Sequence, residues 1–74
     1  MESKKEKFLR EFNEAIESGK TKYVVAVKLP TGATEIIINT ELIETKRDYC
    51  NKAYDDDLKL NTCPEIELVS YMFC

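Results

Sequence analysis

The sequence predicts an α+β domain with the element order α-β-β-α-β, in which two helices cover one face of a three-stranded antiparallel sheet. Three observations support this fold class. Apolar residues recur at helical spacing in two segments, three other segments alternate or are β-branched, and only two Gly and two Pro interrupt them. A chain of 74 residues has room for one domain only, which we place at residues 1–74.

The first helix is predicted over residues 4–18. Ser3 and Glu6 have the spacing of a capping box, in which each side chain accepts a hydrogen bond from the other residue's backbone N–H. A single apolar stripe follows along the helix, formed by Phe8, Leu9, Phe12, Ala15 and Ile16. We expect Gly19 to end the helix, because glycine readily takes the left-handed conformation found there.

Two strands are predicted to form a hairpin. Residues 22–29 are rich in β-branched side chains and are apolar on both faces, which is typical of an interior strand. Residues 30–33 form a turn, with Pro30 at its first corner and Gly32 supplying a positive φ. Residues 35–39 then return as the second strand.

The second helix is predicted to start after Asn39 or Thr40, since either side chain can cap it. Tyr49 and Tyr54 lie five residues apart, so we expect only one of them to be fully buried. The aspartates at 55–57 would lie at a helix C-terminus, where the dipole disfavours negative charge. Either the helix stops around Tyr54, or the run has a role other than stability.

The third strand is predicted over residues 65–73, with residues 58–63 as a connection whose leucines fold back on the core. Strict alternation puts one set of side chains on a common face: Ile66, Leu68, Ser70 and Met72. The helical return leaves the second and third strands pointing the same way, with the first between them, in the order 2-1-3. The edge at 36–38 is unprotected and invites pairing with another chain.

The acidic charge lies in the second half of the chain. Residues 1–28 have seven Lys/Arg and five Glu, whereas residues 29–74 have four Lys/Arg and nine Asp/Glu. A negative surface repels nucleic acid and membranes and suits a basic protein partner. We therefore expect no direct nucleic-acid binding and no membrane binding. The one basic cluster is interleaved with glutamates and is predicted to be a solvated helix face: Lys4, Lys5, Lys7 and Arg10.

Several kinds of chemistry are not favoured by this composition. The chain has no His, no C-x-x-C spacing and no glycine-rich loop before a helix. We expect no enzymatic activity, no metal and no cofactor. The three cysteines fit free, packed thiols in a reducing cytoplasm. No apolar run approaches a bilayer span or a signal peptide, so we predict a cytoplasmic location in a bacterial host cell.

Three passages resemble, in general style, the small orphan proteins carried by phages and prophages of Gram-positive bacteria: residues 37–49, 53–58 and 69–73. The resemblance covers most of the chain and assigns no role to any residue. It implies that the protein binds and redirects a host protein, as anti-CRISPR proteins do.

The first functional hypothesis is a non-enzymatic acidic module. It would bind a basic surface of a host or defence protein, such as a CRISPR-Cas effector, and compete there with nucleic acid. The predicted contact residues are Glu44, Asp48, Tyr54, Asp55, Asp56 and Asp57. For the aspartate run, a solvated helix end and a divalent-cation site remain the alternatives. The alternative function is a self-associating structural or assembly protein, a homodimer paired through the 36–38 edge.

Overall fold

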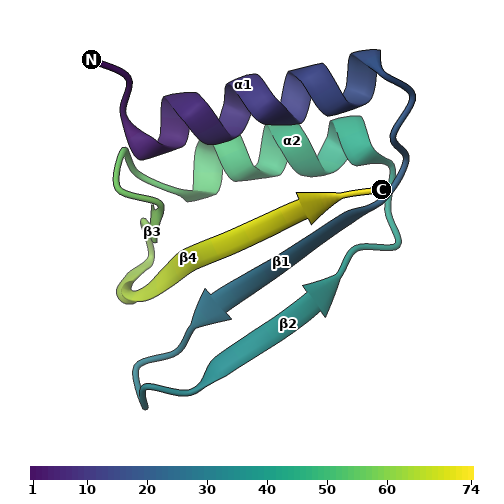
Figure 1. The fold of residues 1–74 in the computed structure, drawn as a ribbon. Helices are drawn as coiled ribbons and strands as arrows, with labels where there is room; N and C mark the ends of the chain where they lie inside the picture. Colours follow the sequence, from purple (N-terminus) through teal and green to yellow (C-terminus); the bar gives the residue numbers. More distant parts are fainter.

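The computed structural model describes all 74 residues as two helices and one sheet (Figure 1). The elements are α1 (Lys4–Glu17), β1 (Tyr23–Lys28), β2 (Thr34–Ile38), α2 (Ile43–Ala53), β3 (Lys59–Leu60) and β4 (Cys63–Phe73). The strands pair antiparallel in the order β2-β1-β4-β3, and both helices lie on one side of the sheet. The α+β class and the antiparallel sheet are confirmed. The prediction of three strands is wrong, because the sheet has a fourth.

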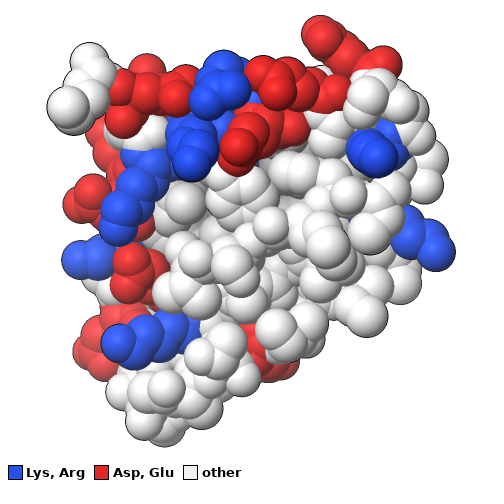
Figure 2. Space-filling model, in the orientation of Figure 1, with Lys and Arg blue, Asp and Glu red and all other residues white.

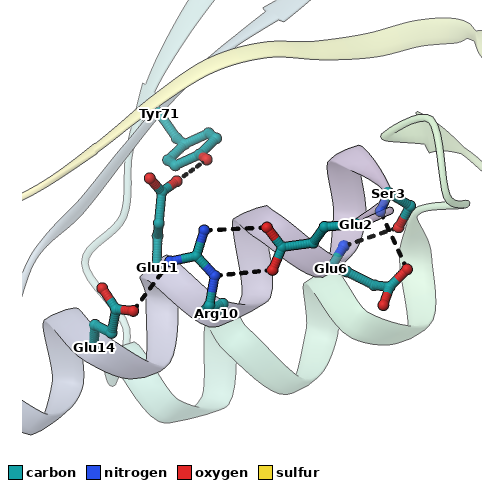
Figure 3. Close-up of polar contacts among 7 residues, drawn as sticks. All are labelled: Glu2, Ser3, Glu6, Arg10, Glu11, Glu14 and Tyr71. Carbon is teal, nitrogen blue, oxygen red and sulfur yellow. Dashed lines mark hydrogen bonds and ion pairs between the residues drawn. The ribbon is translucent and has the colours of Figure 1, made fainter.

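The first helix begins with the predicted capping box. The Ser3 hydroxyl accepts from the Glu6 N–H, and the Glu6 carboxylate accepts from the Ser3 N–H, both at 3.1 Å (Figure 3). The helix ends at Glu17, and Gly19 follows with φ of 89°. Its start and its end are therefore determined by neighbouring residues, which is why the sequence predicts them within one residue.

The second helix begins later than predicted. Neither Asn39 nor Thr40 caps it; the N-cap position is Leu42, which has no side-chain hydrogen bond to the helix. Asn39 instead continues the sheet, where its N–H donates to the Tyr23 carbonyl at 2.9 Å. Its side-chain amide donates to the Glu41 carbonyl. The prediction failed because a tertiary hydrogen bond in the sheet competes with local capping.

The additional strand, β3, lies in the segment predicted as a connection. It pairs with β4, placing Lys59 opposite Glu67. Before it, Leu58 has a positive φ of 62° and is only 5% exposed. A leucine rarely takes this conformation, so the residue type at position 58 does not indicate the reversal. Burial of the side chain offsets the backbone cost.

A β-bulge in β4 changes which residues share a face. Leu68 lies opposite Val27, but two residues later Ser70 lies opposite Ala26, so Val69 is an extra residue without a partner. Leu68 is 3% exposed in the core, whereas Ser70 is on the opposite face. The predicted grouping of these two residues on one face is wrong, because a one-residue insertion inverts the alternation beyond it.

The core lies between the helices and the sheet. At its centre is a cluster of five aromatic rings: Phe8, Phe12, Tyr23, Tyr71 and Phe73. The Phe12 ring centroid is 4.9 Å from that of Tyr23 and 4.8 Å from that of Phe73. The second helix adds Ile43 and Cys50, which are 5% and 2% exposed. All of this packing uses one face of the sheet.

Candidate functional site

The predicted acidic contact residues are spread along α2 and the turn that follows it. Glu44 and Asp48 are exposed on α2, and the aspartates at 55–57 follow its other end. The helix has 11 residues, so roughly 15 Å separate its two ends. Three basic residues lie along the same helix: Lys46, Arg47 and Lys52. The acidity predicted from the sequence is therefore dispersed and interleaved with positive charge.

Within the aspartate run, Asp55 has a structural role. Its carboxylate accepts hydrogen bonds from the N–H groups of Asp57 and Lys59, both at 2.9 Å. These bonds form the turn that leads from α2 into β3. The exposed carboxylates of Asp56 and Asp57 have no hydrogen-bond or ion-pair partner. Only these two of the three remain free to contact a partner.

The position of the run also corrects the expected dipole cost. The first of the two alternatives holds, because α2 ends at Ala53, before the aspartates. The Asp56 carbonyl accepts from the N–H of Lys5, in the first turn of α1, at 3.2 Å. The run therefore lies beside a helix N-terminus, where the macrodipole favours negative charge. The tertiary fold changes a predicted unfavourable contact into a favourable one.

Of the two tyrosines, Tyr54 is the buried one. It is 8% exposed and belongs to the core. The prediction that its ring contacts a partner therefore does not fit its burial. Tyr49 is 49% exposed, and the Lys46 ammonium lies 4.6 Å from its ring centroid. The expectation that only one ring is buried is confirmed, and the buried ring is Tyr54, the tyrosine predicted as a contact residue.

On α1, the charge of Arg10 is neutralised by two glutamates. Arg10 is paired with Glu2 at 2.8 Å and with Glu14 at 3.1 Å (Figure 3). Glu11, on the same helix, accepts a hydrogen bond from the Tyr71 hydroxyl. These contacts fit the prediction that the basic cluster of this helix is a solvated face.

No arrangement of catalytic groups stands out in the structure. No cluster of three or more His, Cys, Asp or Glu side chains is placed to hold a metal ion. The buried Cys50 thiol lies 3.8 Å from the Tyr23 hydroxyl, and burial raises the pKa of the thiol. The thiolate, which is the nucleophilic form, is therefore disfavoured. No helix has the length and apolar character needed to cross a membrane.

The most distinctive surface is the face of the sheet that no helix covers. Because Tyr23, Val25 and Val27 point into the core, their neighbours along β1 and the residues paired with those neighbours point the other way. We call six of these residues the open face: Val24, Ala26, Ile36, Ile38, Ser70 and Met72. Lys28 and the residues paired with it, Thr34 and Glu67, continue the same side of the sheet toward the β1–β2 turn. None of the six is charged, and Figure 2 shows a broad area without charged side chains over β4, β1 and β2.

The open face is exposed and slightly concave. Ile36, Ile38 and Met72 are 63%, 65% and 56% exposed. A hollow of about 170 Å³ lies among Ile36, Met72, Ala26 and Ser70. Sequence reasoning missed this surface because the bulge places Met72 beside Val24 rather than with Leu68. An adjacent row of exposed large apolar side chains commonly marks an interaction site.

The outer edge of β2 is also free. Two hydrogen bonds between the paired strands join odd-numbered residues: the Asn39 N–H donates to the Tyr23 carbonyl, and the Leu29 N–H donates to the Ala33 carbonyl. Along an antiparallel strand, successive residues direct their backbone groups alternately toward one neighbour and the other. The even-numbered residues of β2 therefore direct their N–H and C=O groups outward, away from β1. These residues are Thr34, Ile36 and Ile38. The strand contains no Lys, Pro or bulge that would block pairing.

Comparisons with models of protein families, with curated proteins and with solved structures found no match. Two features of the chain are adjacent: the open face and the free edge of β2 share Ile36 and Ile38.

Proposed function

We propose that the chain is a non-enzymatic self-associating protein that pairs with a second copy through the free edge of β2. The observation that carries this proposal is the row of outward N–H and C=O groups on Thr34, Ile36 and Ile38, in a strand whose five residues are all exposed. An unpaired edge of this kind is a template for strand addition. Such pairing suits a structural or assembly role.

One register satisfies every outward group. With a two-fold axis at Ile36, each copy's Ile36 lies opposite the other's, and Thr34 lies opposite Ile38 of the second copy. All of these positions have outward-facing groups, so each residue exchanges both backbone hydrogen bonds with its partner. The two sheets then become one continuous sheet across the axis, which is the usual form of a symmetric dimer by strand addition.

The side chains are compatible with this register. Glu35 is the one charged residue of β2, and it shares the helix-side face with Ile37. In the proposed register Glu35 lies opposite Ile37 of the second copy, so the two carboxylates are not directly opposed. On the other face, the isoleucines at 36 and 38 of both copies form one apolar row.

A proline substitution tests the edge directly. Because the Ile36 N–H points outward, Ile36→Pro removes an intermolecular donor and leaves the ladder to β1 intact. Ile37→Pro is the matched control, since its N–H bonds inward. We expect sedimentation analysis to show an associated wild type and loss of the edge pairing in Ile36→Pro, while Ile37→Pro has the lower melting temperature. A wild type that stays monomeric at high micromolar concentration contradicts the proposal.

A second candidate function is the acidic module that binds a basic surface of a host or defence protein. The exposed carboxylates of Asp56 and Asp57, which have no partner in the chain, support it. A phage-encoded inhibitor of this kind would compete with nucleic acid for a positive channel. Capture from bacterial lysate with the wild type and with the Asp56→Asn/Asp57→Asn variant tests it. A stoichiometric basic partner that the variant loses is the expected result, and retention by the variant counts against it.

A further inference from the structure

We infer that the open face is a second interface, which packs against the open face of another copy, so that edge-paired dimers assemble into a dimer of dimers. The composition and shape of the open face support the pairing of faces by themselves. The expected shortfall in interface size and the final stoichiometry rest on the proposed function, because they need the edge interface as well.

The size of the edge interface is the first reason to expect another. The β2 strand has five residues, whereas stable protein interfaces bury about 800 Å² on each partner. A short strand pair that adds only backbone hydrogen bonds and its flanking side chains falls short of this. Edge pairing also brings together the isoleucines at 36 and 38 of two copies, which are more than 60% exposed. The dimer therefore has a larger uncovered apolar face than the monomer.

The chemistry of the open face indicates which partner covers it. All six of its residues are uncharged and Ser70 is the one with a polar side chain, while Lys28 and Glu67, at the end of the same side, are opposite charges paired across β1 and β4. The face therefore presents no excess of charge to a basic protein, a phosphate or a nucleic acid. An apolar sheet fits such a face, and this chain itself presents one. Sheets pack face to face at about 10 Å with interdigitating side chains.

The surface shape of the open face is self-complementary. Ile36 and Met72 protrude on either side of the hollow, which Ala26 and Ser70 also line. Two faces related by a two-fold axis in the plane between them place a protruding side chain of each copy over the hollow of the other. Protruding side chains and a depression on the same patch are what an isologous interface requires.

The distribution of charge favours this approach. Each copy has a net charge of −3, so copies repel one another at long range. The charged side chains gather along α1 and at the margins of the view in Figure 2, not on the open face. Contact through the open face thus keeps the like charges of two copies apart.

A two-by-two set of full-length variants separates the two interfaces. Thr34→Pro blocks the edge, because the Thr34 N–H points outward and Thr34 is not one of the six open-face residues. Met72→Lys places a charge on the open face without changing β2. We expect sedimentation to give a dimer of dimers for the wild type, a dimer for each single variant and a monomer for the double variant. Tyr49→Lys, a charge introduced at a comparably exposed apolar residue of α2, is the control and should keep the wild-type mass.

The outcomes of this set are distinct. If Met72→Lys keeps the wild-type mass while Thr34→Pro lowers it, the open-face interface is refuted and the edge pairing stands. If only Met72→Lys lowers the mass, the edge pairing is refuted and the open-face interface stands. A Tyr49→Lys variant that dissociates like Met72→Lys refutes the specificity of the open face.

Folding of the variants is checked by circular dichroism and melting temperature. Ser70→Glu provides a second open-face variant, because Ser70 is exposed and its longer replacement fills the hollow. A folded Ser70→Glu protein should have the same reduced mass as Met72→Lys. A folded Ser70→Glu protein with the wild-type mass overturns the inference even if Met72→Lys is unfolded.

Discussion

The two faces of the sheet have similarly apolar strand residues, yet the fold treats them differently. On the covered face, Tyr23, Val25 and Val27 are at most 5% exposed beneath the helices. On the open face, Ile36, Ile38 and Met72 are more than half exposed. The difference shows that an apolar strand pattern indicates how much sheet surface must be buried, whereas the number of helices determines how much of that surface the chain buries by itself. The apolar surface that stays uncovered is the basis of both proposed interfaces.

The largest expected effect is on the stability of the covered face. Phe12→Ala should lower the free energy of unfolding by about 3–5 kcal/mol, because it leaves a cavity in the aromatic cluster. At concentrations where the chain is monomeric, Met72→Ala on the open face should change it by less than about 0.5 kcal/mol. Urea titration followed by circular dichroism measures both. Equal costs for the two variants would break the comparison between the faces.

A smaller effect is expected at the turn that supports the covered face. Asp55→Ala removes the acceptor of two backbone hydrogen bonds at the turn that presents the buried Leu58 to the core. It should cost about 1 kcal/mol, whereas Asp55→Asn keeps an acceptor oxygen and should cost less. Asp57→Ala is the control, with an expected change within about 0.5 kcal/mol. Thermal unfolding that ranks Asp57→Ala as the most damaging of the three would contradict this role.

The covered face should also make stability sensitive to alkaline pH. Burial, followed by the hydrogen bond to Glu11, raises the pKa of Tyr71 to about 12 from its ordinary value of 10.0, and burial raises the pKa of Tyr54 to about 12. Folding therefore favours the neutral phenols. Their contribution is complete below about pH 10 and is lost as the pH rises through about 12.

Melting temperatures measured between pH 8 and pH 12 test this dependence. Tyr71→Phe should show a shallower decline above pH 10, because one of the raised pKa values is removed. A wild-type melting temperature that stays flat to pH 12 would show that the tyrosines of the covered face do not resist ionisation.

The sequence by itself predicts those elements that are determined by neighbouring residues. The Ser3–Glu6 capping box and the Gly19 stop define α1, and Gly32 has the positive φ expected of the turn between β1 and β2. These interactions span a few residues, so composition and spacing are enough to identify them. The free edge of β2 is predictable for the same reason, since its isoleucines adjoin a recognisable turn.

The remaining features depend on contacts between residues distant in the sequence. The bulge at Val69 and the pairing of β3 arise from registers that strands adopt only when they meet, and one inserted residue decides which side chains join the open face. Burial of Tyr54 rather than Tyr49 is likewise set by where α2 lies on the core. The aspartate run lies at the N-terminus of α1 because the chain returns there after α2. Local sequence determines the elements, but only their packing decides which charges meet and which apolar surface stays uncovered, because both depend on distances that the linear order of residues does not contain.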